Sequence, residues 1–411
     1  MATDNAGSIQ SPEEVAKAVI ESVKQRGDEA LREFTRKYDN ADINSFLVSE
    51  EEIKRARKAV PEEVMEVMAA AKKNVEKFAR RQMTQYENFE IETMEGVFAG
   101  QRIVPMERVG CYVPGGNYPL PSTVLMTVIP AKVAGVKEIV VCSPPKDNNS
   151  INPVTITAAD ICGADKIYKV GGPAAIAAMA LGTKSVPKVD KIVGPGNAYV
   201  TAAKKLLYGD VGIDLLAGPT EILVIADDSA DPVLVAADLL SESEHDERAS
   251  CTLITDSALL KSEVEQEMER QLANLKTKEI ISKALRNKRV FLVANIEEAI
   301  EKANEIAPEH VELQVRNADT LASLLRNYGS LFIGKYAPSV LGDYCIGTNH
   351  VLPTGGSARF SSGLSVKDFI NIRTYQYVKK DGYARIADIA IKLAGIEKLD
   401  AHKKSAEARM K

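Results

Sequence analysis

Three observations predict an α/β protein whose parallel sheets form two lobes. Short apolar strands alternate with helices between about Val109 and Tyr208, and they do so again between Ile222 and Ile333. Most of these strands are near-continuous apolar runs, which is typical of parallel strands covered by helices on both faces. At 411 residues the chain is long enough for more than one domain. We therefore expect two lobes, with additional helices at both ends of the chain.

The chain starts with a helical segment. Residues 11–14 (Ser-Pro-Glu-Glu) have the arrangement of a capping box at a helix start, and Gly27 can close that helix. Charge-rich helical sequence continues to about Arg81, whereas residues 82–107 have the composition of strands and turns. We expect these helices to lie beside the sheet of the second half, because the module from Val109 to Tyr208 looks inserted.

The inserted module contains three strand–helix units. Its strands and following helices are expected at Glu138–Ser143 and Pro153–Cys162, Lys166–Val170 and Pro173–Leu181, and Lys191–Val193 and Ala198–Tyr208. The preceding loop is rich in Gly and Pro, and Ser122 at its end can cap the next helix. Parallel sheets bind ligands at the carboxyl ends of their strands, where Gly171-Gly172 and Gly194-Pro195-Gly196 could bring backbone N–H groups near a pyrophosphate. Tight-turn geometry explains both turns equally well, and GxGxxG is absent, so these turns leave nucleotide binding open.

The stretch from Ala217 to Asp246 organises the second half. A Gly-Pro turn precedes the strand Ile222–Ala226, and a helix that Asp231 can cap follows. The expected inward positions of this helix include Leu234, Ala237 and Leu240. Glu242 and His245 near its end are three residues apart, so on a helix they share one face, as in proteins where Glu-x-x-His binds a metal. A solvated helix end explains the same spacing, and both interpretations remain open at this point.

Further polar residues follow along the second half. Its later strands are expected at Thr252–Thr255, Val290–Val293 and Leu331–Ile333. Glu309 and His310 lie in a short loop that enters the apolar segment Val311–Val315, and an adjacent Glu and His can supply two general bases of different pKa. A polar loop tip is the alternative. Asp343 and His350 lie in a later loop, and the segment from Val366 to the C-terminus is expected to be helical and polar.

The composition excludes several classes of function. A net charge of -5 provides no basic surface for nucleic acid, and no apolar run is long enough to span a bilayer. We therefore expect neither a nucleic-acid partner nor a membrane partner. The five cysteines are scattered and form no CxxC pair, which fits reduced thiols in a cytoplasmic protein.

Together these segments resemble the histidinol dehydrogenase family from roughly residue 10 to the C-terminus. The resemblance rests on the ordered motifs VGCYVPGG, PSTVLMTVIPAKVAG, GPGNAYVTAAK, AGPTEILVIAD, DLLSESEH, APEHVEL, GDY, NHVLPT, SARFSSGLSV and a terminal Glu-x4-His. It implies two incomplete Rossmann-like lobes, similar to those of aldehyde dehydrogenases. Residues 10–108 and 218–364 would form the first lobe, and residues 109–217 the inserted lobe on the cofactor side. Residues 365–411 would form a helical extension that completes the partner subunit's site in a homodimer.

The resemblance also implies an activity and a role for each matching residue. The activity would be the oxidation of L-histidinol through L-histidinal to L-histidine, the last step of histidine biosynthesis, with two NAD and one Zn²⁺ per subunit. The zinc ligands, which would also contact the substrate, would be Glu242, His245, Asp343 and His402. The catalytic bases would be Glu309 and His310, of which His310 would also contact the substrate. The other substrate contacts would be Ser122, Thr220, His350 and Glu397, and the cofactor contacts would be Tyr112, Asn197 and the position of Ala174.

The chain departs from the family pattern at three positions. Glu242 stands where the family usually has a glutamine ligand, Thr220 where it has serine, and Ala174 where it has a glutamine near the cofactor. The carboxylate of Glu242 keeps an oxygen donor but adds negative charge. Ala174 removes a possible hydrogen bond to NAD.

These departures leave two other functions open. One is a related zinc- and NAD-dependent dehydrogenase of another small polar alcohol such as a sulfopropanediol, a branch that GPTEI and Thr374-Tyr375-Gln376 resemble. Glu397 favours histidinol instead, because a carboxylate there can meet an imidazole or an amine, whereas a sulfonate would need a cation. The other is a catalytically silent metal-binding paralogue, against which the presence of both Glu309 and His310 argues.

Overall fold

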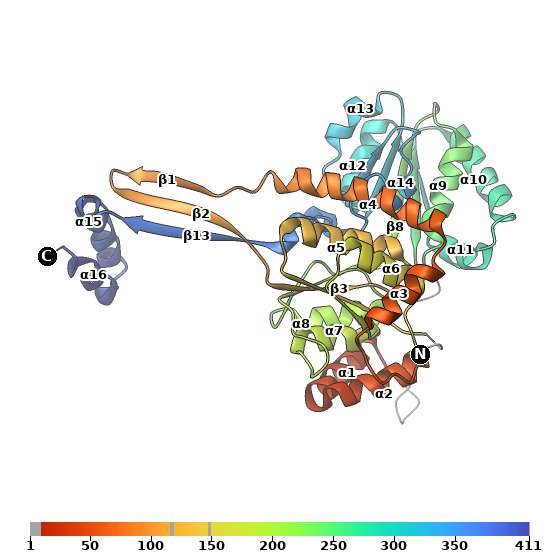
Figure 1. The fold of residues 1–411 in the computed structure, drawn as a ribbon. Helices are drawn as coiled ribbons and strands as arrows, with labels where there is room; N and C mark the ends of the chain where they lie inside the picture. Colours follow the sequence, from red (N-terminus) through yellow and green to blue (C-terminus); the bar gives the residue numbers. More distant parts are fainter. Residues whose placement is uncertain (1–9, 116–118, 147–148, 411) are drawn as a thin grey trace.

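The computed structural model describes residues 10–115, 119–146 and 149–410. Within these residues, the body contains two parallel five-stranded sheets covered by helices, and a narrow three-stranded sheet carries the C-terminal helices away from the body (Figure 1). This arrangement confirms the predicted α/β class with two parallel sheets and helices at both ends.

The first sheet has the strand order β5-β4-β3-β6-β7, and all of its pairs are parallel. Its strands are β3 (Arg108–Tyr112), β4 (Glu138–Ser143), β5 (Lys166–Lys169), β6 (Lys191–Val193) and β7 (Gly212–Ile213). The helices between them are α5 (Pro121–Ala134), α6 (Pro153–Cys162), α7 (Gly172–Leu181) and α8 (Ala198–Leu207). These elements closely match the prediction. One detail is wrong: Leu120 is the N-cap of α5 and no side chain caps this helix, so Ser122 does not cap it.

The N-terminal helices form outer layers on the first sheet. They are α1 (Pro12–Arg26), α2 (Asp28–Asp39), α3 (Glu50–Ala59) and α4 (Glu62–Met83), and the predicted capping box of Ser11 and Glu14 is confirmed. We expected these helices beside the second sheet, but α1 packs on α7 and α8, while α3 and α4 pack on α6 and α5. The reason is that α5 and α7 are apolar on all sides and therefore need cover on their outer faces as well. How the chain divides into domains stays a prediction.

The second sheet has the strand order β10-β9-β8-β11-β12 and is also parallel. Its strands are β8 (Glu221–Ala226), β9 (Ser250–Thr255), β10 (Arg289–Leu292), β11 (His310–Gln314) and β12 (Ser330–Ile333). The helices of this half are α9 (Pro232–Ser243), α10 (Ala258–Leu272), α11 (Lys278–Ala284), α12 (Ile296–Ile306), α13 (Ala318–Leu321) and α14 (Ser339–Tyr344). Short 3-10 turns cover Leu285–Asn287, Ala322–Leu324, Ser357–Arg359 and Val366–Phe369. Both sheets therefore have the same strand order. The first strand of each, β3 or β8, lies in the middle, the next two strands lie on one side of it, and the last two lie on the other side.

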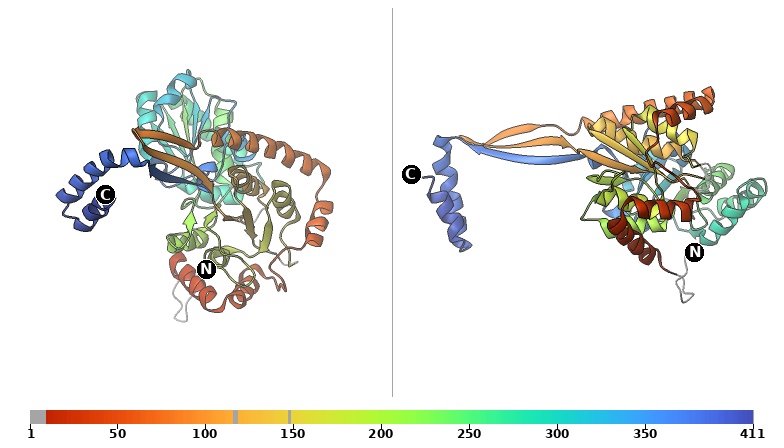
Figure 2. Two further views of the ribbon diagram at one scale, coloured as in Figure 1. Left: turned by 60° about the vertical axis from the view of Figure 1, so that its left-hand side comes forward. Right: turned by 60° about the horizontal axis from the view of Figure 1, so that its bottom comes forward.

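A long arm projects from the body. It consists of β1 (Phe89–Met94), β2 (Val97–Pro105) and β13 (Ile370–Val378), and its end carries α15 (Lys380–Ile396) and α16 (Asp400–Glu407) (Figure 2). The prediction that the chain is helical from Val366 onward is wrong for β13, which pairs antiparallel with β2 along its whole length. β13 is rich in β-branched and aromatic residues, which favour a strand once a partner strand is available.

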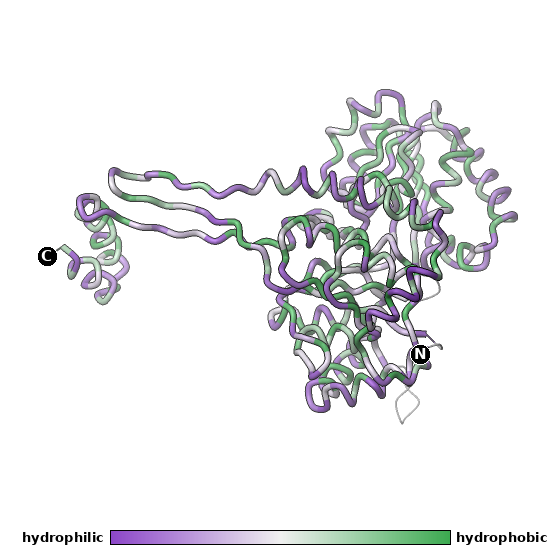
Figure 3. Tube along the Cα trace, in the orientation of Figure 1, coloured by the Kyte–Doolittle hydropathy of each residue, from purple (hydrophilic) through white to green (hydrophobic). Residues whose placement is uncertain are grey.

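The apolar residues gather in the two sheets and in the helices that face them (Figure 3). In the part of the chain that the structure describes, no helix is both long and apolar enough to cross a membrane.

Candidate active site

The first part of the site lies at the end of α9. Asp231 caps this helix, as predicted, by accepting a hydrogen bond from the N–H of Val233. The helix ends at Ser243, so His245 lies in the bend that follows and not on the helical face. Glu242 is still close to it, because Glu242 Oε2 and His245 Nε2 are 3.4 Å apart. The side chain of Glu242 is only 1% exposed, so the interpretation as a solvated helix end is wrong for this carboxylate.

The inward stripe of α9 is shifted by one residue from the prediction. Val235, Ala236, Leu239 and Leu240 are buried, whereas Leu234 and Ala237 are only partly buried. This rotation turns Glu242 toward the protein interior.

Asp343 on α14 and His310 on β11 lie beside Glu242 and His245, and these four residues form a cluster. Asp343 Oδ1 lies 3.6 Å from His310 Nε2, and both residues are buried. His310 Nδ1 lies 3.1 Å from the carbonyl oxygen of Glu221. Because a carbonyl only accepts, Nδ1 carries a hydrogen, and Nε2 of the neutral ring remains able to accept a proton. One ligand atom from each of Glu242, His245 and Asp343 lies within 4.8 Å of the other two.

The cluster lies at the amino ends of two neighbouring strands. His310 is the first residue of β11 and pairs with Ile222 near the start of β8. We expected ligands at the carboxyl ends of the strands of the first sheet, whereas this cluster lies at the amino ends of strands in the second sheet. The donors come from residues that enter the strands and from the end of α9, which runs back toward the edge where the strands begin.

Glu309 lies beside His310 in the wall of the cluster. Its Oε2 accepts a hydrogen bond from the N–H of Glu221 at 3.0 Å and lies 3.8 Å from His310 Nδ1. Both side chains are buried, so the loop-tip interpretation is wrong. Burial raises the pKa of Glu309 to about 8. A general base is most effective when its pKa lies near the working pH, so Glu309 is suited to proton transfer.

The buried negative charge of the cluster favours a bound cation. Burial alone would lower the pKa of His310, but the carboxylates of Glu242 and Glu309 and the contact with Asp343 raise it well above its ordinary value. Glu242 Oε2 and His310 Nε2 are buried and have no hydrogen-bond partner in the described part of the chain. Buried carboxylates are costly unless a donor or a cation compensates them. Two carboxylates and an imidazole suit zinc, manganese or cobalt, so these residues fit a divalent metal.

Some of the predicted substrate contacts surround this cluster. His350 Nδ1 lies 2.8 Å from the carbonyl oxygen of Asp343, and His350 Nε2 lies 3.4 Å from Thr123 Oγ1. Burial lowers the pKa of His350, which favours the neutral ring. Thr123 follows Ser122 in the first turn of α5, so the contacts of His350 bring the start of α5 close to α14. Thr220 directly precedes β8, at the edge that carries the cluster.

The predicted cofactor contacts gather at the carboxyl edge of the first sheet. Tyr112 ends β3, and its hydroxyl accepts a hydrogen bond from the N–H of Gly172 at 3.0 Å. Ala174 is buried in the first turn of the same helix, α7. Asn197 caps α8 by accepting hydrogen bonds from two backbone N–H groups of its first turn. The three positions therefore lie at turns that follow parallel strands, as expected for this sheet.

A buried ion pair holds the turn that contains Asn197. Gly194 has a φ of +113°, and a Cβ there would lie 2.2 Å from the carbonyl oxygen of Tyr112, so only glycine fits. The N–H of Gly194 donates to Asp214 at 2.7 Å, and Lys204 Nζ donates to the Gly194 carbonyl at 3.0 Å and pairs with Asp214. This pair was not predicted, although Lys204 lies among the apolar positions of α8 and could have indicated it.

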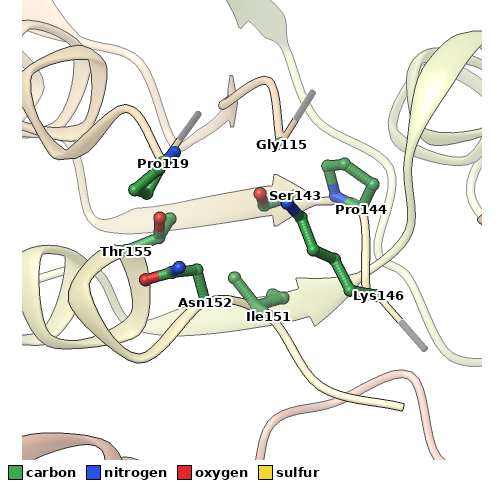
Figure 4. Close-up of a pocket in the computed structure, with 8 residues that line it drawn as sticks. All are labelled: Gly115, Pro119, Ser143, Pro144, Lys146, Ile151, Asn152 and Thr155. Carbon is green, nitrogen blue, oxygen red and sulfur yellow. The ribbon is translucent and has the colours of Figure 1, made fainter. Parts of the chain in front are cut away.

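Two cavities lie near these turns. The larger has a volume of about 460 Å³ and is lined by residues of both halves, among them Gly196, Ala198, Lys205, Gly218, Pro219 and Arg248. It joins the turn after β6 to the segment before β8 and has room for part of a dinucleotide. The smaller cavity follows β4, is lined by Ser143, Asn152 and Thr155 among others, and measures about 10 Å³ (Figure 4). That is room for a single water molecule.

The structure does not bring Glu397 and His402 to the cluster of the same chain. Glu397 is the C-cap that follows α15, and His402 lies on α16, at the end of the arm; both residues are exposed (Figures 1 and 2). A further residue, Ser339, does reach the cluster and was not predicted. Its hydroxyl contacts Glu242, and the only sequence signal was its spacing of four residues from Asp343.

Known proteins match the chain along nearly its whole length. A family model described as histidinol dehydrogenase matches residues 3–410. A histidinol dehydrogenase from Methanocaldococcus jannaschii is 46% identical over 393 residues, which cover 96% of this chain and 91% of that protein. A histidinol dehydrogenase from Bacillus cereus is 46% identical over 392 residues, which cover 95% of this chain and 91% of that protein.

Solved structures agree with these matches. The crystal structure of histidinol dehydrogenase from Elizabethkingia anophelis aligns with a TM-score of 0.94 and 40% identity, covering 99% of this chain and 94% of that one. A Burkholderia cenocepacia protein described as an aldehyde dehydrogenase aligns with a TM-score of 0.51 and 17% identity, covering 91% and 89% of the two chains. At this identity the likeness concerns the fold alone, and it agrees with the expected aldehyde-dehydrogenase-like lobes.

Proposed function

The chain belongs to the histidinol dehydrogenase family, and from this premise we propose that it oxidises L-histidinol through L-histidinal to L-histidine with two NAD and one zinc ion per subunit. The observation that carries the proposal is the buried cluster in which Glu242, His245 and Asp343 converge beside two candidate bases. This reaction needs ligands for one metal ion and bases for two proton transfers, and the cluster contains candidates for both.

We assign the zinc ion to Glu242, His245 and Asp343 of one subunit, with His402 of the other subunit as the fourth ligand. Glu242 Oε2 has no hydrogen-bond partner in the described residues, and this atom and the excess of buried negative charge support the assignment. When bound, zinc would hold the hydroxyl oxygen of the substrate and make its proton more acidic.

His310 and Glu309 would then divide the proton transfers. His310 Nε2 has no hydrogen-bond partner in the described structure and lies 3.6 Å from Asp343 Oδ1. A cation bound beside it would favour the neutral ring, which can take the hydroxyl proton while a hydride leaves the alcohol carbon for NAD. The product of this step is the aldehyde. Glu309 would take a proton from water as the water oxygen adds to the aldehyde carbon, and the hydrate would give its hydride to a second NAD. Each oxidation thus yields one NADH and one proton.

We place NAD at the carboxyl edge of the first sheet. Tyr112, Asn197 and the position of Ala174 lie there, and the cavity of about 460 Å³ leads from this edge toward the segment of Thr220. Lys205 and Arg248 in its wall carry positive charge that suits a pyrophosphate.

We further propose a homodimer in which residues 365–411 complete the site of the other subunit. The arm carries Glu397 and His402 away from their own cluster, so a second chain has to supply these groups (Figure 2). The exposed apolar residues of α15 support this proposal. Ile389, Leu393 and Ile396 are 45%, 54% and 77% exposed in the single chain. A cytoplasmic location is proposed because all five cysteines, which lie in the described residues, are free.

The alternative substrate, a sulfopropanediol, receives no support from the segment that suggested it. Thr374–Gln376 lies on β13 of the arm, where the ring of Tyr375 covers Gly100 and its hydroxyl donates to Glu90 at 3.0 Å. These contacts give the segment a structural role in the arm.

The test of the shared site uses two inactive variants. His402→Ala should lose its zinc without unfolding, because His402 is exposed and lies far from the body. Glu309→Gln should retain zinc but fail to form histidine. If the sites are shared, mixed dimers of the two variants contain one intact site and recover histidine formation. If His402 served its own chain, mixing would restore nothing, and full zinc content in His402→Ala would contradict the ligand assignment.

A further inference from the structure

The second oxygen of Glu242 is held by a residue that no motif singled out. Ser339 Oγ donates a hydrogen bond to Glu242 Oε1 at 2.6 Å, and the two residues are 0% and 1% exposed. Hydrogen bonds to an ionised carboxylate are roughly twice as strong as neutral ones. Burial removes competition from water, so this contact fixes the orientation of the carboxylate.

Glu242 therefore presents a single oxygen to the cluster. Oε1 is occupied by Ser339, whereas Oε2 lies 3.4 Å from His245 Nε2 and has no hydrogen-bond partner in the described part of the chain. Because α9 ends one residue after Glu242, the helix alone does not fix the position of this side chain relative to α14.

Ser339 is itself anchored to the strand that carries His310. The N–H of Ser339 donates to Glu312 Oε1 at 2.7 Å. Glu312 lies two residues after His310 on β11, so both side chains point to the same face of the sheet. Ser339 and Asp343 are four residues apart on α14 and share one face of that helix. Ser339, the first residue of α14, therefore contacts Glu242 on α9, is bonded to β11 two residues after His310, and shares a helical face with Asp343.

We propose that Ser339 is the positioning residue that holds Glu242 as a one-oxygen ligand of the bound metal. The inference rests on the proposed metal site. Partners of this kind typically contribute a factor of about 10–100 to metal affinity, because they orient the ligand before the metal arrives.

The test compares two buried serines by competition for Zn²⁺ with a chromogenic chelator, using the metal-free full-length protein. Ser339→Ala should weaken zinc binding by a factor of about 10–100. Ser243→Ala is the matched control, because Ser243 is 1% exposed and its hydroxyl donates to the carbonyl of Leu239 at 2.8 Å instead of to Glu242. Its zinc affinity should equal that of the wild type. Ser339→Thr keeps the hydroxyl and should recover most of the affinity.

A double-variant cycle separates positioning from a general structural effect. In a Glu242→Ala background, Ser339→Ala should cause no further loss of zinc affinity, and this comparison decides the matter if the threonine variant does not fold. An unchanged affinity in Ser339→Ala, or the same further loss without Glu242, would overturn the role of Ser339. Failure of the wild type itself to bind zinc would instead contradict the proposed function, so the two failures are distinguishable.

Discussion

The replacement of Glu309 by glutamine tests whether Glu309 is the base of the second oxidation only, while His310 is the base of the first. Glu309→Gln keeps the size of the side chain and an oxygen that can accept the hydrogen bond from the Glu221 N–H, which is 3.0 Å long in the wild type. The fold should therefore persist. The variant loses only the ability to take a proton from water, so the second oxidation should suffer and the first should not.

The expected magnitude follows from general base catalysis. A positioned base contributes a factor of about 10²–10⁴, which corresponds to about 3–5 kcal/mol of activation free energy. The pH profile gives a second number. Burial raises the pKa of Glu309 to about 8, so the protonated carboxyl is favoured at pH 7 in the metal-free protein. A bound cation favours the ionised form. The second oxidation of the wild type should thus rise with pH through an apparent pKa no higher than about 8.

Single-turnover NADH formation separates the two steps. With L-histidinol, zinc-loaded Glu309→Gln should form the first NADH at a rate near that of the wild type and the second about 10²–10⁴ times more slowly. The second step of the variant should also lack the rise with pH. Equal losses in both oxidations, or a preserved pH profile in the variant, would refute the role of Glu309 as the base for water.

Two further predictions concern acidic side chains in the half of the chain that contains the first sheet, Asp214 after β7 and Asp39 at the end of α2. Lys204→Met leaves the carboxylate of Asp214 buried without its cationic partner, since the two side chains are 3% and 1% exposed, and should lower the free energy of unfolding, measured with denaturant, by about 3–5 kcal/mol. It should also weaken NAD binding, because the pair holds the turn that contains Asn197. A loss under 1 kcal/mol would contradict this prediction. Burial raises the pKa of Asp39 to about 7 from an ordinary value of 3.8. The folded state therefore binds the proton more tightly than the unfolded state does, and the free energy of unfolding should fall as the pH rises from about 4 to about 7. Asp39→Asn should therefore raise the Tm more at pH 8 than at pH 4, and equal shifts at both pH values would rule the explanation out.

Local sequence signals predicted most of the elements, because they depend on neighbouring residues. The cap at Asp231, the capping box at Ser11 and the apolar strands of both sheets are examples, and the structure confirms them. The convergence of Glu242, His245 and Asp343 was anticipated only through the family resemblance. No local spacing relates α9 to α14, which join different strands.

The features that the sequence did not reveal depend on distant contacts. β13 becomes a strand because β2, more than 250 residues earlier, offers it a partner edge. The N-terminal helices pack on α5 and α7 because those helices are apolar on all sides, a property that became informative only once the layers were known. Ser339 reaches Glu242 across 97 positions of the sequence, and its spacing of four residues from Asp343 does not relate it to α9.

The most direct test of the proposed function is the stoichiometry of NADH formation from L-histidinol by the zinc-loaded protein. We expect two NADH per L-histidinol, with L-histidine as the product. A protein that holds one zinc ion per chain but forms no NADH from L-histidinol would contradict the proposed substrate. Glu242, Thr220 and Glu397 would then be the positions to examine with other small polar alcohols, beginning with a sulfopropanediol.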